Sequence, residues 1–504
     1  MQPAYTLIQG LEEFTAAREQ FAALVNQLQS NQVLRMEHGE VEELITHEGT
    51  ELLRRLLQGH LDRRTVKETK REEVKGSDGV LRRHVREACQ RGLMTLFGEV
   101  TVRRRGYGAR GEESIFPLDG ELNLPRDSYS HGLRRRLAEE VAGSSFDAAV
   151  LGLERTTGGK VPKRQAEALA AQVSQDFEAF YASRGSDEPE PTLDPLVMSL
   201  DGKGIVMRRE DLREATRRAA EREQHKLKTR LSQGEKRNRK RMATVAAVYS
   251  IERTVRGAES IMGIKAEQDP SPKPRARNKR VWASVQRAPP AVTEELFVEA
   301  LRRDPERRRP WVMLVDGHEG QLEHIHASIE HHRVEVTLIL DFIHVLEYLW
   351  KAAWSFFTPG SEEAEQWVGD RALQILKGKA SDVAAGMRRA ATLRQLSAPE
   401  RKPVDTCADY LLKYRDMLHY DDYLAQGLPI ATGVIEGACR HLVKDRMDIT
   451  GARWRLNSAE AVLKLRSLHS SGDGDVYWDF HKAQELRRNH SSRIIGNRPL
   501  QKAA

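Results

Sequence analysis

Two stretches of the sequence share one pattern: residues 196–202 read LVMSLDG, and residues 311–317 read WVMLVDG. Each is an apolar run that ends in an aspartate followed by glycine, which is typical of a buried strand that stops at a turn. A third run, residues 337–340, ends at Asp341 in the same way. Since Asp-Gly is also a common turn without any function, either pair alone has an ordinary structural explanation. The three runs together predict strands of one buried sheet.

The sequence around these runs predicts a mixed α/β domain. Another apolar run of β-forming composition spans residues 243–251, and helical patterns lie between and after the strands. Prolines before residue 196 mark a boundary, because proline disfavours continued helix or sheet. We expect an α/β core at 196–470. It is interrupted by a basic insertion at 205–241 and by an extended, proline-rich and mobile linker at 268–280.

The amino-terminal part is predicted to be mainly helical. Apolar residues recur at helical spacing within residues 1–90, whereas residues 91–182 begin with a short alternating strand and continue as two helices around Gly158. This pair is a candidate helix-turn-helix, with plain helix packing as the alternative. The carboxy-terminal segment is expected to be helical, with residues 471–504 as a basic carboxy-terminal tail.

Composition limits the class of protein. The chain has 504 residues, 39% hydrophobic content and a net charge of +7, which indicates a folded protein with a mild preference for polyanions. Its three cysteines, Cys89, Cys407 and Cys439, cannot build a disulfide framework or a four-cysteine zinc site. No run approaches the roughly 18 apolar residues of a membrane span. We expect a soluble cytoplasmic protein.

Two basic segments are candidate DNA contacts. Residues 208–241 contain 14 Lys or Arg against 6 Asp or Glu, and a second group of basic residues follows Glu436 with a tryptophan among them. A solvated helical surface is the alternative for both segments. The candidate DNA-binding residues are Lys203, Lys236, Arg237, Arg239, Lys240, Arg241, Lys444, Arg446, Arg453 and Trp454.

Carboxylates at strand ends suit hard divalent cations, which prefer oxygen ligands held on rigid elements. Asp201, Asp316 and Asp341 each follow an apolar run, although Asp341 also fits the cap of the helix that begins after it. Glu436 stands near the start of another helix, where Thr432 is a candidate cap and a glutamate is favoured by the helix dipole.

Five segments taken together resemble the insertion-sequence DDE transposases of the ISKra type, relatives of the Mutator superfamily. They occur in the order of that family and read SLDGKG at 199–204, VDG at 315–317, LDFIHVLEYLW at 340–350, GVIEGAC at 433–439, and DRM to RWR at 445–455. The scattered cysteines depart from related transposases that carry a cysteine-rich zinc element ahead of the core.

The resemblance implies an RNase H-like fold, in which Asp201 and Asp316 lie on neighbouring strands and Glu436 lies on a later helix. It makes these three residues the catalytic, metal-binding triad for two Mg²⁺ or Mn²⁺ ions, which cut and rejoin DNA. Asp341 and His344 match an Asp-x-x-His element with a supporting role. The implied partners are terminal inverted repeats, target DNA and a second copy of the chain, in a bacterial, nucleoid-associated setting.

Two alternatives remain open from the sequence. A nuclease or resolvase of the same fold would cut DNA without strand transfer. A DNA-binding regulator descended from a transposase would bind DNA without catalysis, although the acids at all three positions argue against it.

Overall fold

The computed structural model describes residues 12–184, 190–222, 227, 232, 239–264, 274–449 and 451–494. The chain divides into two compact units, Met1–Ala182 with Asp473–Ala504, and Ser183–Gly472. These are called unit 1 and unit 2. Much of the expected basic insertion, with Lys236 and Arg237, lies outside the described residues, as does the first part of the expected linker.

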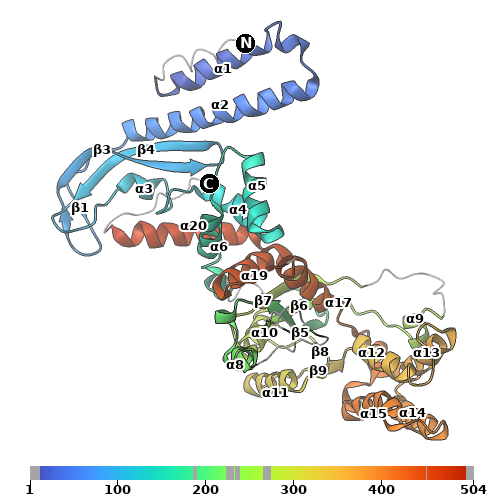
Figure 1. Cartoon of the computed structure of the whole chain (residues 1–504). Coiled ribbons are helices and arrows are strands. Elements are labelled where there is room, and N and C mark those ends of the chain that lie inside the picture. Colours follow the sequence, from blue (N-terminus) through green and yellow to red (C-terminus); the bar gives the residue numbers. More distant parts are fainter. Residues whose placement is uncertain are drawn as a thin grey trace. The chain divides into compact units, whose positions relative to one another are not determined.

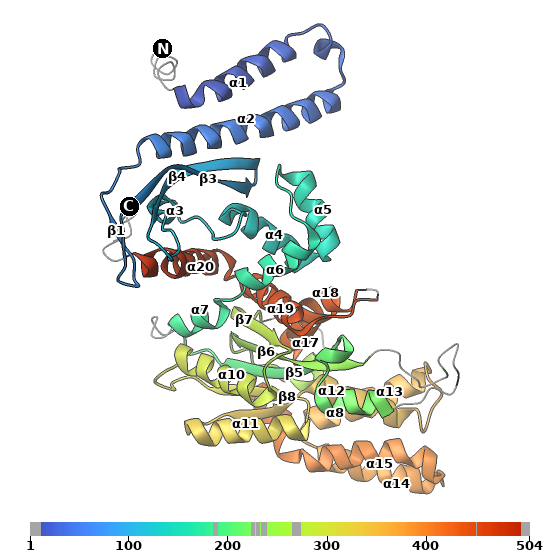
Figure 2. The same cartoon turned by 60° about the vertical axis from the view of Figure 1, so that its left-hand side comes forward.

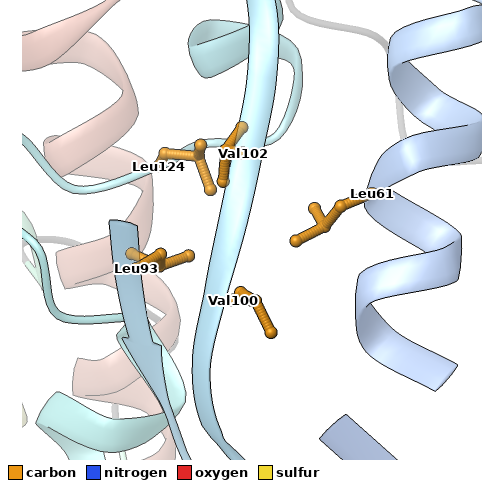
Figure 3. Packing of buried hydrophobic residues seen from close by; sticks show 5 residues of the cluster. All are labelled: Leu61, Leu93, Val100, Val102 and Leu124. Carbon is orange, nitrogen blue, oxygen red and sulfur yellow. The ribbon is translucent and has the colours of Figure 1, made fainter. Parts of the chain in front are cut away.

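Unit 1 begins with two helices and a β-hairpin. Helix α2 packs along strand β4, and β4 pairs antiparallel with β3 (Figures 1 and 2). Leu61, Leu93, Val100, Val102 and Leu124 bury a small core between them, with side chains that point toward one another (Figure 3). The elements are η1 (Glu12–Phe14), α1 (Thr15–Leu28), η2 (Val33–Arg35), α2 (His38–Val66), β1 (Val74–Lys75), β2 (Leu81–Arg82), β3 (His84–Thr95) and β4 (Gly98–Gly108).

Strand β3 begins at His84, within residues 1–90, which the sequence predicted to be mainly helical. Most of its residues are exposed or half-buried. Because it lacks the alternation of apolar and polar residues that marks a half-buried strand, its pattern did not reveal it. The short β1 and β2 strands pair with each other in the same region.

The rest of unit 1 is helical. The turn between α5 and α6 packs on the hairpin: Gly158 N donates to Leu96 O at 2.7 Å, and a Cβ at Gly158 would lie 2.7 Å from Phe97 O. Glycine is therefore required by close backbone approach. The elements are α3 (Pro117–Glu121), α4 (His131–Gly143), α5 (Phe146–Thr156), α6 (Lys163–Val173), α7 (Phe177–Ser183), α20 (Gly474–Asn489) and η6 (Ser491–Arg493).

The expected tail at 471–504 is instead largely a folded part of unit 1. Helix α20 buries Tyr477, Trp478 and His481, and His481 Nδ1 lies 2.7 Å from a carboxylate oxygen of Asp176. The basic residues near its end drew the prediction of a tail, but the aromatic residues on its other positions need a core to cover them.

Unit 2 is built on a five-stranded mixed sheet in the order β7-β6-β5-β8-β9. Strands β5, β6 and β7 pair antiparallel, whereas β5 pairs parallel with β8, and β8 pairs parallel with β9. The strands are β5 (Leu196–Val206), β6 (Lys240–Ser250), β7 (Arg277–Ser284), β8 (Trp311–Val315) and β9 (Thr337–Leu340). The runs at 196–200, 243–251, 311–315 and 337–340 are thus confirmed as strands.

Three strand boundaries differ from the prediction. Strand β5 continues past Asp201 to Val206, because β6 pairs with its whole length. The expected insertion at 205–241 therefore begins inside β5 and ends inside β6, and the structure places η3 (Arg209–Asp211) and α8 (Glu214–Arg222) between them. The expected linker at 268–280 overlaps β7, whose first three residues are exposed and polar or charged and so resemble a linker in sequence.

Helices cover the sheet and protect its edge. Helix α10 packs against β5 and β6, and α19 runs along the β7 edge, where Ser471 Oγ bonds both the N–H and the carbonyl of Val281 (Figure 2). These helices and their neighbours are α9 (Ala258–Ile261), α10 (Pro289–Arg303), α11 (Glu319–His332), α12 (Phe342–Ala353), α17 (Gly433–Ala438), the π-helix η5 (Cys439–Lys444), α18 (Asp445–Met447) and α19 (Leu456–Ser471).

Between α12 and α17 in the sequence, the chain forms a further group of helices. Helices α14 and α15 lie side by side, and α15 also packs against α12 (Figures 1 and 2). The group consists of α13 (Glu362–Leu376), α14 (Ala380–Leu393), α15 (Ala398–Lys413), η4 (Arg415–Met417) and α16 (Tyr420–Ala425). Among the described residues of both units, no helix combines the length and the apolar character needed to cross a membrane.

Candidate active site

Asp201 and Asp316 come from two strands that lie next to each other. The parallel pairing of β5 with β8 ends at Ser199 and Leu314. Asp201 stands two positions after Ser199, and Asp316 stands two positions after Leu314. Continuing the same register sets the two aspartates opposite each other where β8 ends and β5 continues. The sheet thus brings together two carboxylates that are far apart in the sequence.

The loop after β8 is held in place by tyrosines. Asp316 Oδ1 accepts a hydrogen bond from His318 N at 2.8 Å, and Gly317 has a φ of 86°. Tyr410 OH donates to Asp316 O at 2.9 Å, and Tyr414 OH donates to Gly317 O at 2.5 Å. The Asp-Gly turn expected from the sequence is therefore present, and α15 with its C-cap residue Tyr414 fixes the position of the Asp316 backbone.

Asp201 contacts the segment that follows Glu436. Its side chain is half-buried, and Cys439 Sγ donates to its Oδ2 at 3.1 Å. Cys439 is the first residue of the π-helix η5, a type of helix turn that is rare and often found at functional sites. Burial, followed by the neighbouring Asp201 carboxylate, raises the pKa of the Cys439 thiol, so the sulfur remains a protonated donor.

Glu436 lies on the exposed face of α17, in its first turn. Partial burial raises the pKa of Glu436, and the nearby carboxylates of Asp341 and Asp201 raise it further. When neighbouring carboxylates raise the pKa of a carboxyl group, their negative charges repel its ionised form. A bound cation would reduce that repulsion. The mutual influence of Glu436 and Asp201 places both in one acidic neighbourhood.

Asp341 is fully buried and joins two segments. Its Oδ2 accepts from Thr432 Oγ1 at 2.5 Å and lies 2.7 Å from His344 Nδ1. Its Oδ1 accepts from the backbone N–H of Thr432 at 3.1 Å and of Ile343 at 3.2 Å. The Ile343 bond is the helix cap expected for α12. Thr432 occupies the N-cap position of α17, but its side chain bonds Asp341 instead of capping its own helix.

His344 is charged by this environment. The hydrogen bond with Asp341 raises the pKa of His344 to about 8, against the opposing effect of burial. The charges of Asp341 and Asp316 act in the same direction. His344 therefore lies within electrostatic reach of Asp316, as it does of Glu436, whose pKa it lowers.

The donor set fits hard divalent cations, because Asp201, Asp316 and Glu436 offer carboxylate oxygens alone. Their ligand atoms do not form a group within 4.8 Å of one another. Two ions about 4 Å apart, each roughly 2 Å from its oxygens, allow outer carboxylates of such a site to lie about 8 Å apart. A two-ion site therefore does not require all three ligand atoms to lie within 4.8 Å of one another.

A tighter group in the described part of the chain consists of Glu294, His331 and His332, whose ligand atoms all lie within 4.8 Å. His332 Nε2 lies 2.7 Å from Glu294 Oε1, so a hydrogen bond between α10 and α11 already accounts for two of the three. The sequence reasoning did not single out this group, because its members become neighbours only through helix packing.

The residues expected to bind DNA differ in how exposed they are to solvent. Lys240, Lys444 and Arg453 are exposed, and Lys203 and Arg239 are half-buried. Lys203 shares a strand face with Asp201, two residues away. Arg241 instead holds backbone carbonyls, with a 2.8 Å bond from its Nε to Val285 O. Lys236 and Arg237 lie outside the described residues.

Arg446 and Trp454 do not lie where the sequence reasoning expected them. Trp454 is 6% exposed, and its indole N–H donates to Met447 O at 3.0 Å. Arg446 is buried with its guanidinium 4.8 Å from the Trp454 ring centroid, and burial lowers its pKa to about 10. The Trp454 backbone also pairs with Val206 and Arg208 beyond β5. This pair packs the end of the sheet and presents no face for stacking on a base.

Thr432 was expected only as a helix cap, and Cys439 only as one of three scattered cysteines. Their contacts with Asp341 and Asp201 depend on how α17 meets the sheet, and no local pattern encodes that. Their position on either side of Glu436, within residues 432–439, was the available indication.

No protein-family model matches the chain. A stretch of 114 residues is 28% identical to the UPF0236 protein in the vanSb 3' region of Streptococcus gallolyticus. The match covers 22% of this chain and 24% of that protein, so it spans about a quarter of the relative's own length.

Proposed function

We propose that the chain is a DNA transposase of an insertion sequence, similar to the ISKra type, with a catalytic core of RNase H-like fold. Asp201, Asp316 and Glu436 are its catalytic residues. The observation that carries the proposal is the parallel register of the neighbouring strands β5 and β8, whose pairing ends at Ser199 and Leu314. Continued by two residues, this register sets Asp201 opposite Asp316. Glu436 follows on a later helix, α17, which packs against β5.

The three carboxylates would hold two Mg²⁺ or Mn²⁺ ions, which make an attacking oxygen reactive and neutralise charge on the phosphate. What the chain itself does is position the ligands. The sheet fixes Asp201, the tyrosines of α15 fix the Asp316 backbone, and Cys439 bonds one oxygen of Asp201. The rate enhancement then depends on preorganised charge rather than on a protein nucleophile.

Asp341 and His344 support the site without acting as ligands. Every contact of the Asp341 carboxylate is internal, and its full burial leaves no face for an ion. Its role is to hold Thr432, and with it the helix that carries Glu436. His344 is cationic near neutral pH and faces the acidic neighbourhood, which suits contact with a DNA phosphate.

The proposed partners are terminal inverted repeats, target DNA and a second copy of the chain, since two DNA ends must meet for coordinated cutting. The exposed basic residues Lys240, Lys444 and Arg453 support a polyanionic partner.

The test is incubation of labelled DNA bearing the element's terminal inverted repeats with the purified protein and Mg²⁺. Asp201→Asn, Asp316→Asn and Glu436→Gln should each lose cleavage by roughly a hundredfold or more, while DNA binding persists. Asp382→Asn on α14 and Glu323→Gln on α11 are matched controls, because both side chains are exposed and neither helix carries a residue of the site. They should cleave normally.

Separate assays for cut and joined products distinguish strand transfer from simple hydrolysis. Products that are cut but never joined to target DNA would make the protein a nuclease. Unchanged cleavage in all three carboxylate variants would overturn the assignment of the site.

A further inference from the structure

A groove of about 570 Å³ lies between α12 and α15 in unit 2. Its walls combine two aromatic rings with two lysines. The lining residues are Tyr348, Lys351, Trp354, Ser355, Glu400, Lys402, Pro403 and Thr406. Nothing in the proposed catalytic triad uses these side chains.

The aromatic surface in the groove is accessible and held in place. Trp354 is 52% exposed, whereas Trp282, Trp311, Trp367, Trp454 and Trp478 are buried. Tyr348 stacks on Tyr410, with ring centroids 4.0 Å apart and planes 11° from parallel. The backing ring fixes the Tyr348 plane, so one face of the groove is a rigid aromatic platform next to an exposed indole.

The charge in the groove favours an anion. Lys351 Nζ lies 5.0 Å from the Tyr348 ring centroid, and its side chain is 55% exposed. Lys402 is also exposed. Glu400, the acidic residue of the lining, bonds the backbone N–H and the hydroxyl of Ser397 at the start of α15. Its carboxylate is directed at its own helix. Lys351 Nζ also lies 3.8 Å from Glu347 Oε2, but this ion pair is solvent-exposed and therefore weak, so Lys351 and Lys402 can still pair with a phosphate.

Helix α12, which lines the groove, also carries His344 of the candidate active site. Residues 344, 348, 351 and 355 recur at four-, three- and four-residue spacing, which places them along one face of the helix. His344 is at the end near Asp316, and Tyr410, which backs Tyr348, donates to Asp316 O. A helix rises about 1.5 Å per residue, so Trp354 lies roughly 15 Å along the axis from His344.

We propose that this groove binds an unpaired nucleotide stretch of the DNA strand that leaves the catalytic carboxylates. A base would stack on Trp354 and Tyr348, and flanking phosphates would pair with Lys351 and Lys402. Exposed aromatic faces interleaved with lysines are the combination that binds single strands without reading their sequence. A span of roughly 15 Å along the helix corresponds to a few nucleotides. The inference rests on the proposed function, because it takes the DNA strand as the ligand.

The experiment measures binding of an oligothymidylate to the full chain in EDTA, so that no cleavage is needed. Trp354 is the exposed tryptophan of the described residues, and stacking of a base should quench the protein's fluorescence. In fluorescence anisotropy with a labelled oligothymidylate, Trp354→Leu and the double variant Lys351→Ala with Lys402→Ala should each bind roughly tenfold more weakly. Binding of a blunt duplex should be unchanged.

Controls separate the groove from the reaction. Lys379→Ala, an exposed lysine outside the groove in the same helical group, should bind as the unaltered chain does. Asp201→Asn should also bind oligothymidylate normally. If the unaltered chain cleaves terminal-repeat DNA but the groove variants bind oligothymidylate equally well, the groove proposal fails and the transposase proposal stands.

If no cleavage occurs but the groove variants lose oligothymidylate alone, the groove binds a single strand and the proposed reaction fails instead. Equal loss of duplex and single-strand binding would overturn the assignment to an unpaired strand. Circular dichroism of the double lysine variant checks folding, since both replaced side chains are at the surface.

Discussion

The hydroxyl of Thr432 donates a 2.5 Å hydrogen bond to Asp341, a carboxylate with no exposed surface. The bond joins the end of strand β9 to the start of the helix that carries Glu436. A second bond, from Thr432 N to the same carboxylate at 3.1 Å, fixes the backbone as well. The position of Glu436 relative to the sheet is therefore determined by a buried polar contact that involves neither Asp201 nor Asp316.

Replacing Thr432 by valine should lower both stability and cleavage. Valine keeps the shape but removes the donor, so a buried charged oxygen loses a partner, at a cost of about 1–3 kcal/mol. Helix α17 should become less firmly placed, and the rate of DNA cleavage should fall more than DNA affinity does. Thermal melting and single-turnover cleavage measure the two effects.

The matched control is Thr432→Ser, which retains the hydroxyl and should keep most of both properties. Valine and serine variants with the same melting temperature and the same cleavage rate would show that the bond with Asp341 positions nothing.

Protonation of His344 should stabilise the fold in a defined pH range. Its pKa is raised from 6.5 to about 8 by the bond with Asp341, so the folded state binds the proton more tightly than the unfolded state. The stabilisation is complete below pH 6.5 and is lost as the pH rises through 8. The difference in melting temperature between the unaltered chain and His344→Asn should shrink over this range, measured in EDTA.

Asp341→Asn provides the comparison for His344, since it removes the charge that holds the proton. In that background, the effect of His344→Asn should depend less on pH, because the hydrogen bond and charge that raise the His344 pKa most are gone. A difference that instead grows with rising pH in the native background would contradict the ion pair.

The apolar runs ending in aspartate predicted β8 and β9 with the bounds that the structure has, because these strands are short and buried. Strand β5 was predicted too short. Its extension past Asp201 is half-buried and contains two glycines, and it is stabilised by antiparallel pairing with β6, a long-range contact that local composition does not encode. Strand β7 was missed for a related reason: its first three residues are exposed, polar or charged, and resemble a linker.

In the candidate site, too, local features of the sequence could be predicted and long-range contacts could not. Asp201 and Asp316 were identified from the ends of apolar runs, which are local features. Asp341 holds Thr432, and Cys439 donates to Asp201, only because of where α17 lies against the sheet. Trp454 was assigned to the surface, although the chain after β5 buries it. A tryptophan flanked by arginines has the same local sequence whether it is buried or exposed.

The three cysteines should differ in reactivity toward iodoacetamide. Burial raises the pKa of Cys407 to about 12, and burial with the Asp201 carboxylate raises the pKa of Cys439, so both are unreactive thiols. Cys89 is half-buried on β3. Mass spectrometry of the native protein at about pH 8 should find Cys89 labelled first, with the other two labelled only after denaturation. Native labelling of Cys439 as fast as that of Cys89 would argue against its bond with Asp201.

Two glutamates of unit 2, the buried Glu299 and the exposed Glu306, should contribute differently to stability. Glu299 on α10 is 3% exposed and accepts a 2.8 Å bond from Arg280, which ties α10 to β7, and a 2.7 Å bond from Arg303 within its own helix. Burial alone would raise its pKa, but the neighbouring guanidiniums, Arg280 above all, lower it to about 2. Its contribution to stability is present above pH 4.5 and is lost as the pH falls toward 2.

Glu299→Gln should therefore destabilise unit 2 strongly, because buried Arg303 loses its paired carboxylate and buried Arg280 loses Glu299 and keeps Glu295, at a cost of about 3–5 kcal/mol. The melting temperature should fall by roughly 10 °C. Glu306→Gln removes an exposed carboxylate paired with Arg308 and should cost less than about 1 kcal/mol. Calorimetry at pH 7 compares the melting temperatures of the two variants. Equal decreases would mean that water reaches the Arg280–Glu299 pair in solution. Near pH 2 the two variants should differ little, since protonation has then removed the charge that the substitution removes.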